Sequence, residues 1–380
     1  MTRTCLFITN GLGLGNSTRC YAVMEHLVEQ GFRIHVLTSG NGLTFFQHKS
    51  CIDSLTQTGS FYYSSANGVI SGWSTLKSIK NLLSIAKTKR ADLSALLDRI
   101  QPDVAVIDSE YALAPLRMRR IPIIAINSSE IVVSQYLKQK TKPANVRSHF
   151  WFVGFFDYLF HKHFCDLILS PFPLKTKTRS AKFRRVGLIA RQAILQHARK
   201  PDDVSFPSPR SLQTVIFMLS GSVHASRISF PQDLPFKIEV VGVPGESRQN
   251  LIYHGRQMDN VDLLRRADAL VVNGGYSAVS EAFVLGRPVF VVPVPGHAEQ
   301  FVNAALVRDL GLGFVATETN VVSRLLEMFE QNRWVGRKPL PAAFEIDGAR
   351  ESAGLIASFV EAFKYSRSPS PQRLTAAESS

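Results

Sequence analysis

Two glycine-rich turns carry the residues whose types and spacing could support chemistry in this chain of 380 residues. The second turn, Asn273-Gly274-Gly275, follows the apolar run 269–272 and precedes a helical pattern that begins at Ser277. Glycines let the backbone approach a ligand closely, and the first amides of a helix present unpaired donors and a positive dipole end. Glu281 lies one turn into that helix. The segment therefore predicts a site for a diphosphate.

The first glycine-rich turn, Gly11 to Gly15, follows the apolar residues 6–9 and opens a helical pattern over 17–30. As a bare pattern this turn is weak, because dinucleotide enzymes carry similar turns. Those enzymes end their second strand with an acidic residue that binds ribose, whereas Thr38-Ser39-Gly40 stands at that place here. The first turn therefore does not indicate a dehydrogenase.

Both turns belong to a repeated pattern of a short apolar run, a turn and a helical period. Strands that alternate with helices predict parallel sheets, so we expect an α/β fold with two doubly wound, Rossmann-like domains. Proline, serine and aspartate are frequent between Pro201 and Arg210, which is typical of an exposed linker. The predicted units are an N-terminal domain over 1–200, a C-terminal domain over 201–364 and a disordered tail over 365–380. The apolar runs predicted as strands are 6–9, 33–38, 104–107 and 123–126, then 215–219, 237–241, 251–254, 269–272 and 289–292.

The composition limits the class of protein. With 45% hydrophobic and 19% charged residues, the chain can bury large cores and lacks the signature of disorder. Its four cysteines have no paired-ligand spacing, which argues against a disulfide framework or a structural zinc site and favours a reducing cytosol. No apolar stretch is long enough for a membrane span, and the first apolar run is too short for a signal peptide.

The segment from Ala267 to Ala304 resembles the donor-binding region of GT-B glycosyltransferases. The similarity is to the group of family 28 and the UDP-glycosyltransferases, which includes peptidoglycan N-acetylglucosaminyltransferases. It implies that Glu281 hydrogen-bonds the ribose of the donor, and that Glu299 and Gln300 contact the hydroxyls of the donor sugar. Many relatives have histidine where this chain has Asn273, although an amide can still donate to a phosphate.

A third turn follows the predicted strand 215–219 and matches the place where relatives bind phosphates through a glycine and a hydroxyl. The resemblance gives that role to Gly221 and Ser222. Taken alone, a Gly-Ser turn could also simply end a strand. The predicted donor site therefore combines this turn with the residues of the second turn and its helix.

The first glycine-rich turn is similar to the acceptor-side loop of the same enzymes. Gly13, Gly15 and Arg19 stand at positions that match this loop. Asn16 occupies the position where the loop usually has a histidine, and asparagine cannot act as a general base. The resemblance thus predicts an acceptor-binding loop without its usual base.

Asp108, at the end of the predicted strand 104–107, is the first candidate for the missing base. Plant relatives pair an aspartate at the corresponding strand end with the loop histidine, so the carboxylate could act directly here. Glu110 is the second candidate, and an unseen group is the third. Asp108 could instead cap a helix that begins near Tyr111.

The resemblance implies two domains that face a cleft, with the donor on the C-terminal domain and the acceptor on the N-terminal one. The expected reaction moves a sugar from a nucleotide sugar, by resemblance a UDP-sugar, to a hydroxyl of a lipid-linked acceptor or cell-surface glycan, with inversion. Helix-end amides would neutralise the departing diphosphate, so we expect neither a metal nor a cofactor besides the donor. A nucleotide-sugar 2-epimerase of the same fold and a non-catalytic nucleotide-sugar-binding protein remain open. A helix over about 346–363 is expected to return to the first domain, as in relatives.

The middle of the chain is basic and aromatic. Nine Lys or Arg residues and no acid lie between 175 and 200, within a formal net charge of +14. Large apolar rings are concentrated upstream, over 150–160. Rings beside cations suit an anionic membrane surface, which predicts a cytoplasmic protein that docks on the inner face of the cell membrane; packing inside the protein explains the same pattern. Nucleic-acid binding is disfavoured because no recognition module is present, and a metal at His161 and His163 lacks further ligands.

Overall fold

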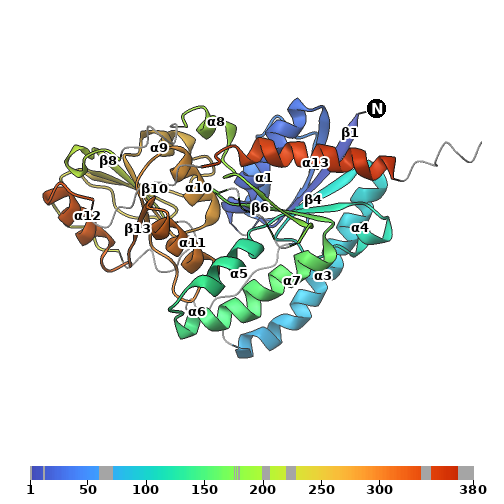
Figure 1. Cartoon of the computed structure of the whole chain (residues 1–380), viewed down its shortest axis with the longest axis horizontal. Helices are drawn as coiled ribbons and strands as arrows, with labels where there is room; N and C mark the ends of the chain where they lie inside the picture. Colours follow the sequence, from blue (N-terminus) through green and yellow to red (C-terminus); the bar gives the residue numbers. More distant parts are fainter. Residues whose placement is uncertain are drawn as a thin grey trace, which may run out of the picture.

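The computed structural model contains two parallel β-sheets, each flanked by helices on both faces (Figure 1). The structure describes residues 2–11, 13–59, 72–174, 176, 178, 180–198, 206–219, 228–334 and 344–366. Both sheets are doubly wound, since the strand order reverses direction beside the first strand of each sheet. The prediction of two Rossmann-like α/β domains is confirmed.

The first sheet has seven strands in the order β3-β2-β1-β4-β5-β6-β7. Thr9, the last residue of β1, pairs with Thr38 of β2 and with Asp108 of β4, so three strand ends lie at one level. The loops that follow these strands therefore emerge side by side at the carboxyl edge. The strands are β1 (Arg3–Thr9), β2 (Phe32–Thr38), β3 (Ser54–Gln57), β4 (Val104–Asp108), β5 (Ile123–Ile126), β6 (Leu167–Pro171) and β7 (Phe183–Val186).

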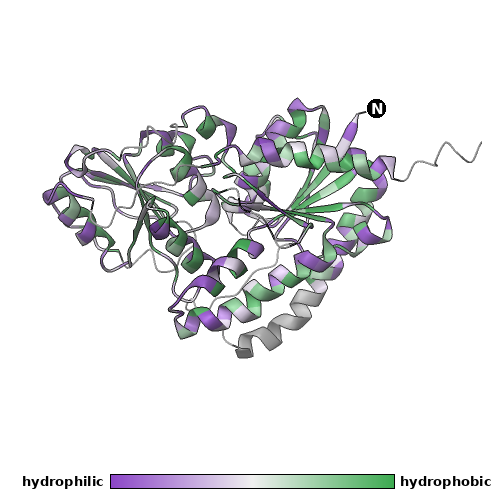
Figure 2. Cartoon of the chain, in the orientation of Figure 1, coloured by the Kyte–Doolittle hydropathy of each residue, from purple (hydrophilic) through white to green (hydrophobic). Residues whose placement is uncertain are grey.

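The central strands of this sheet are apolar on both faces (Figure 2). Phe7 and Val106 face a cluster formed with α1 (Leu14–Glu29) and α13 (Gly348–Tyr365), whereas Ile8 and Ile107 face α3 (Gly72–Ile100) and its neighbours. Successive residues of a strand point to opposite faces, and helices on both sides explain why the strands are continuously apolar. The other helices are α2 (Asn41–Phe46), α4 (Ala114–Met118), α5 (Ser129–Lys138), α6 (Ala144–His149), the π-helix η1 (Phe150–Gly154) and α7 (Phe155–Phe164).

The second sheet has six strands in the order β10-β9-β8-β11-β12-β13. The strands are β8 (Thr214–Met218), β9 (Lys237–Val241), β10 (Leu251–Gly255), β11 (Ala269–Val272), β12 (Val289–Val291) and β13 (Gly313–Val315). The helices are α8 (Gln192–Leu195), a 3-10 turn (Pro209–Ser211), α9 (Val261–Arg266), α10 (Tyr276–Val284), α11 (Ala298–Asp309) and α12 (Val321–Glu330). Two apolar clusters, one on each face of the sheet, form the core of this domain.

The chain crosses between the domains twice, and the two crossings touch. After β7, the backbone N–H of Leu188 donates to the carbonyl of Glu345 at 2.8 Å, and that of Gly348 donates to Leu188 at 2.9 Å. A Cβ on Gly348 would lie 1.9 Å from the carbonyl oxygen of Gly187, so the contact requires glycine there. Beyond Gly348, α13 runs along the first domain beside α1, which confirms the expected return of this helix (Figure 1). The predicted boundary near residue 200 and residues 367–380 of the predicted tail lie outside the described residues, whereas Tyr365, placed in that tail by the prediction, is the last residue of α13.

Candidate active site

A cavity of about 330 Å³ lies where the carboxyl edges of the two sheets meet. The first domain lines it with Gly13, Gly15 and Asn41, and the second half of the chain with Arg191, Ser277 and Glu281. Ligands of doubly wound folds bind in the crevice outside the carboxyl ends of the strands. The position of this cavity therefore agrees with the predicted donor site.

Two helix N-termini meet at this cavity, one from each domain. Gly13 precedes α1 and Gly275 precedes α10, and neither helix begins with a side-chain cap. Ser277 Oγ donates a hydrogen bond of 2.7 Å to the carbonyl of Gly15, which holds the two helix ends together. The first amides of both helices are thus available to an anion, and both dipoles favour it.

The turn Asn273-Gly274-Gly275 has the close backbone approach that its glycines predict. Gly274 has a φ of 84°, and a Cβ there would lie 2.8 Å from Val291, so only glycine fits without strain. Asn303 Nδ2 donates to the Gly274 carbonyl at 2.9 Å, and Asn273 Nδ2 donates to the carbonyl of Val292 at 3.2 Å. The amide of Asn273 therefore braces the neighbouring strand end. Gly221 and Ser222 belong to residues 220–227, outside the described part of the chain, and their role stays a prediction.

Glu281 is buried in the wall of the cavity and is held by an arginine that the sequence analysis did not assign to the site. Arg191 Nε donates to Glu281 Oε1 at 2.7 Å, and its Nη2 donates to Oε2 at 2.9 Å. Arg191 lies in the segment between β7 and β8 that links the two sheets, immediately before α8. The one available signal was its position within the basic segment 175–200, because the pairing itself spans 90 residues.

Glu299 and Gln300 lie in the first turn of α11, outside the lining of the 330 Å³ cavity. Ser128 Oγ, from the first domain, donates to Glu299 Oε1 at 3.2 Å. Gln300 Oε1 accepts from the backbone N–H of Val294 at 2.8 Å, which fixes the turn before the helix. Glu299 therefore lies between the two domains, and Gln300 orients the backbone beside it.

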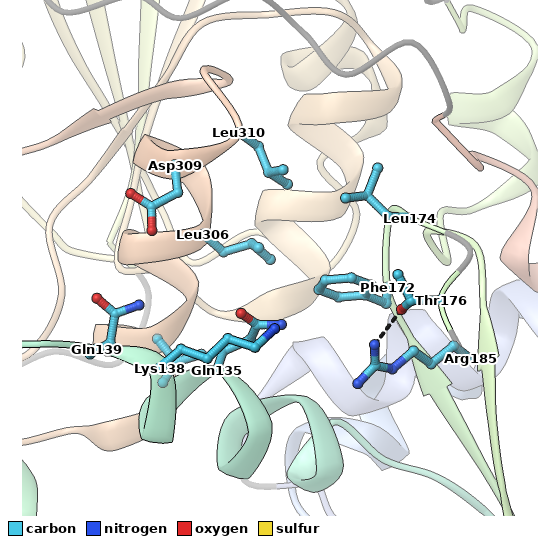
Figure 3. A pocket seen from close by; sticks show the side chains of 11 residues that line it. Gln135, Lys138, Gln139, Phe172, Leu174, Thr176, Arg185, Leu306, Asp309 and Leu310 are labelled. Carbon is cyan, nitrogen blue, oxygen red and sulfur yellow. Dashed lines mark hydrogen bonds between the residues drawn. The ribbon is translucent and has the colours of Figure 1, made fainter. Parts of the chain in front are cut away.

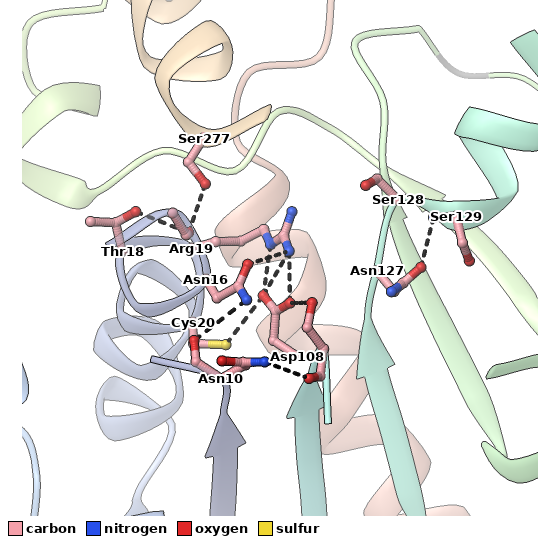
Figure 4. Close-up of polar contacts among 12 residues, drawn as sticks. Asn10, Asn16, Thr18, Arg19, Cys20, Asp108, Asn127, Ser128, Ser129 and Ser277 are labelled. Atoms are coloured by element: carbon pink, nitrogen blue, oxygen red, sulfur yellow. Dashed lines mark hydrogen bonds and ion pairs between the residues drawn. The ribbon is translucent and has the colours of Figure 1, made fainter. Parts of the chain in front are cut away.

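Asn16, Arg19 and Asp108 come together in the first domain (Figure 4). Arg19 Nε donates to Asp108 Oδ2 at 2.9 Å, and Nη2 donates to Oδ1 at 2.8 Å. Asn16 Oδ1 makes only a long contact, 3.5 Å, with Nη2 of Arg19. Asp108 is 0% exposed, and Ser109 Oγ donates to it at 3.2 Å. Burial raises the pKa of Asp108, while the charge and hydrogen bonds of Arg19 oppose this effect.

Glu110 is the residue that caps the loop after β4. Its Oε1 accepts from the backbone N–H groups of Tyr111 at 2.9 Å and Ala112 at 3.0 Å, and its Oε2 lies 2.5 Å from Lys89 Nζ. The interpretation of Asp108 as a helix cap near Tyr111 is wrong, because α4 begins at residue 114 and Asp108 faces Arg19 instead. Glu110 is buried in these contacts, so its carboxylate is already occupied by three donors.

Two histidines contact each other across the interface between the two domains, at the start of α11. The rings of His149, on α6, and His297 lie 4.9 Å apart. His149 Nδ1 accepts from the N–H of Ala298, and His297 Nδ1 accepts from that of Gln300, both at 3.4 Å. Burial, with a smaller effect from His297, lowers the pKa of His149 to about 4. The two imidazoles thus accept from backbone N–H groups in the first turn of the helix that carries Glu299.

A second cavity, of about 210 Å³, lies elsewhere in the interface between the domains, between α5 and α11 (Figure 3). Phe172, Leu174, Leu306 and Leu310 give it apolar walls. Lys138 lines it from the end of α5. The interface between the domains therefore has two cavities. The one of 330 Å³ beside β1 is the more polar, and the one of 210 Å³ beside β7 is the more apolar.

The structure thus places the uncapped N-termini of two helices, one from each doubly wound domain, at one cavity, and comparison with known proteins gives the class. The family model of glycosyl transferase family 1 matches residues 4–332, so the chain belongs to this family. An uncharacterized glycosyltransferase of Methanosarcina acetivorans is 25% identical over 356 residues, 84% of this chain and 87% of that protein. A UDP-N-acetylglucosamine--N-acetylmuramyl-(pentapeptide) pyrophosphoryl-undecaprenol N-acetylglucosamine transferase of Clostridium perfringens is 23% identical over 86% of this chain and 89% of its own length.

Solved glycosyltransferases share the fold. The calicheamicin glycosyltransferase CalG4 superposes with a TM-score of 0.56 at 17% identity, over 97% of this chain and all of that chain. MurG of Acinetobacter baumannii gives a TM-score of 0.53 at 16% identity, over 95% and 99% of the two chains. The protein is therefore a glycosyltransferase with the GT-B fold.

Within the residues that the structure describes, no group of three or more His, Cys, Asp or Glu side chains could hold a metal ion. Within the same residues, every helix is too short or too polar to cross a bilayer. His161 Nδ1 donates a hydrogen bond of 2.8 Å to the carbonyl of Asp157, and His163 Nδ1 donates one of 2.8 Å to the carbonyl of Leu159.

Proposed function

We propose that the protein transfers a sugar from a UDP-sugar to a hydroxyl of a lipid-linked acceptor or cell-surface glycan, with inversion at the sugar carbon. The observation that carries this proposal is the cavity between the uncapped N-termini of α1 and α10, with Glu281 in its wall. The name of the Clostridium relative, which includes UDP-N-acetylglucosamine, supports UDP as the nucleotide. The comparisons give no support to a 2-epimerase.

The leaving diphosphate would lie on the helix ends. Amides at the start of α10, with those of α1 opposite, would stabilise the charge that develops as the sugar departs, without a metal ion. Glu281 would accept hydrogen bonds from the ribose. Glu299, at the start of α11, would receive the hydroxyls of the sugar. The donor would thus extend from the cavity toward the Ser128–Glu299 contact.

The acceptor would approach from the first domain. Asp108 remains the proposed base, and its raised pKa brings a carboxylate closer to the working range of a base. Because Asp108 is buried against Arg19, the acceptor can reach it only when this ion pair opens. The apolar cavity beside β7, with Lys138 at its edge, supports an acceptor with both apolar and anionic parts.

Donor binding is tested by thermal unfolding with a panel of nucleotides and nucleotide sugars. A ligand that binds only the folded protein raises the melting temperature by mass action. UDP and one UDP-sugar should stabilise the protein, and Glu281→Ala should remove the effect. Transfer is then tested by mass spectrometry of the acceptor product. The absence of any nucleotide response would contradict the proposal, and release of UDP with an altered free sugar would favour the epimerase.

We also propose that the helix 150–164 docks on an anionic membrane surface at the inner face of the cell membrane. Phe150 is buried against Tyr136, but Trp151, Phe152 and Phe156 are 48%, 77% and 61% exposed. Exposed rings next to basic side chains favour the headgroup region. Phe152→Ser should reduce flotation with anionic liposomes, whereas Met118→Ser, at an exposed apolar side chain elsewhere on the domain, should not. Equal flotation with neutral and anionic vesicles would contradict docking.

A further inference from the structure

Two cavities lie side by side along α5. The cavity of about 210 Å³ lies between α5 and α11, and a larger one, of about 540 Å³, lies between α5, α7 and β7. Lys138, Thr176 and Arg185 line both cavities, so these three side chains separate one from the other. The two cavities together, which we call the α5 trough, therefore extend from α7 to α11.

Much of the wall of the α5 trough is apolar. Leu137, in the larger cavity, is 59% exposed. Tyr158 of α7 and Phe183 of β7 are stacked there, with their ring centres 5.4 Å apart. The other apolar lining residues are Val133 in the larger cavity and Phe172, Leu174, Val302, Leu306 and Leu310 in the smaller one. Covering apolar surface that water reaches is favourable, so the trough suits an apolar chain.

The lining of the α5 trough also carries an excess positive charge. Arg185 is neutralised by Glu130, to which its Nε donates at 3.1 Å and its Nη2 at 2.7 Å. The carboxylate of Asp309 accepts from Arg308 Nε at 3.0 Å. Within the part of the chain that the structure describes, Lys138 is the remaining charged lining residue, and its side chain extends into the smaller cavity (Figure 3). A ligand in the trough therefore meets an ammonium group, which favours an anion.

The two ends of the α5 trough lie where transfer to a lipid-linked acceptor needs them. At one end, Tyr158 belongs to α7, part of the helix proposed above to dock on a membrane. At the other end, Val302 lies three residues after Glu299 on α11, a rise of about 4.5 Å. Lys138 lies between these ends, about 15 Å along α5 from Ser128, which contacts Glu299. The trough thus joins the proposed membrane face to the proposed sugar site.

We propose that the α5 trough binds a lipid-linked acceptor, with the apolar chain in the larger cavity and the phosphate of that chain at Lys138. The inference rests on the proposed function and deepens it, because it names a chain joined to a phosphate as the part of the acceptor that the protein recognises. Beyond the phosphate, the sugar of the acceptor lies in the smaller cavity, where Gln135 and Gln139 offer side-chain amides to its hydroxyls. Its free end points along α11 toward Glu299.

The test measures three probes on the full-length protein by titration calorimetry: decyl phosphate, decyl maltoside and inorganic phosphate, with both amphiphiles below their critical micelle concentrations. Decyl phosphate should bind about tenfold or more tightly than either of the other two, because it alone carries both parts. Leu137→Ser should weaken both amphiphiles by about fivefold, since it removes apolar wall. Lys138→Met keeps the apolar stem, so it should weaken decyl phosphate by about fivefold, the scale of one exposed ion pair, but not decyl maltoside.

Each variant has a matched control. Lys140→Met removes an exposed positive charge two residues away, outside the lining of both cavities. Met118→Ser removes an exposed apolar side chain elsewhere in the first domain. Neither control should change the affinity of any probe, and circular dichroism checks that every variant keeps the fold of the wild type.

The outcomes separate the inference from the proposed function. Decyl phosphate that does not bind, or that binds all variants equally, would overturn the inference. Equal weakening of both amphiphiles by Lys138→Met would overturn the phosphate site, and an equal loss in Met118→Ser would indicate an adventitious additive only. UDP is titrated in the same way. A wild type that binds UDP but not decyl phosphate keeps the proposed donor and loses the trough, whereas the reverse result keeps the trough and loses the donor.

Discussion

Two buried arginine–carboxylate pairs stand on opposite sides of the cleft, and they differ in what surrounds them. Arg19 and Asp108 belong to the first domain, and Arg191 and Glu281 to the second half of the chain. Both pairs are bidentate, with contacts between 2.7 and 2.9 Å. Only the second pair lines the 330 Å³ cavity between the domains, the proposed donor site.

The two pairs differ in what the carboxylate can do while its ion pair with arginine stays intact. Asp108 is fully enclosed and also faces Ser109 and Cys20, so it can take a proton only after its contacts with Arg19 open. Glu281 can accept hydrogen bonds from a ligand with its ion pair intact. The same chemical pair is therefore enclosed in the first domain and lines a cavity in the second.

The largest expected effect comes from Asp108→Asn. The change leaves Arg19 buried without a counter-charge, which should lower the free energy of unfolding by about 3–5 kcal/mol. Turnover should fall by roughly 10² or more, the scale of a general base, with donor affinity largely kept. Urea unfolding and steady-state kinetics measure the two effects. The double change Arg19→Met with Asp108→Leu should recover stability but not turnover; recovered turnover would show that Asp108 is not the base.

The free energy of unfolding should depend on pH through His149, which lies at the interface between the domains. Its pKa in the folded protein, about 4, is below the ordinary 6.5, so the unfolded chain binds more protons between these pH values. Stability should therefore decrease as the pH falls from 6.5 to 4, by about 2–3 kcal/mol for this partly buried ring. Thermal unfolding across this window gives the slope. His149→Gln should flatten it, and the exposed His48→Gln should not; an equal slope in all three proteins would assign it elsewhere.

Glu281→Ala probes the second pair directly. Loss of a charged acceptor for the ribose should weaken donor binding by about 1–3 kcal/mol, while turnover at saturating donor changes little. Calorimetry with the donor and kinetics at high donor concentration separate the two quantities. A loss confined to turnover would place Glu281 in the chemical step and remove the contrast between the pairs.

Ser277→Ala should have the smallest effect. It removes the hydrogen bond to the carbonyl of Gly15 that joins α10 to α1, worth about 0.5–1.5 kcal/mol. Donor affinity should fall by no more than about tenfold. Calorimetry with UDP measures the change, and Ser366→Ala, at the end of α13, serves as the matched control. A much larger loss would mean that the hydroxyl contacts the donor itself.

Much of the fold could be predicted because strands and turns are local features. The runs 104–107 and 269–272 have continuous apolar character and end in polar residues, which is what a buried parallel strand requires. The glycines of the turn 273–275 predicted a close approach of the backbone. The positive φ of Gly274 and its short distance to Val291 explain why glycine is needed there. The return of the last helix followed from the resemblance alone.

The partners of the site residues could not be predicted. Arg19 and Asp108 are 89 residues apart, and Arg191 and Glu281 are 90 apart, so no local spacing relates them. Which arginine reaches which carboxylate depends on how helices and the linker are placed on the sheets. The capping role of Glu110 was missed for the same reason, because it depends on the exact direction of the loop after β4.

The return of α13 to the first domain bears on how the molecule is made. Ala349, Ala353 and Ile356 complete the apolar cluster that covers one face of the first sheet, together with Phe7 and Val106. These residues are translated after the whole second domain. During synthesis, one apolar face of the N-terminal sheet therefore stays partly uncovered until the second domain has left the ribosome. A fragment that stops before residue 348 should expose the same surface and aggregate.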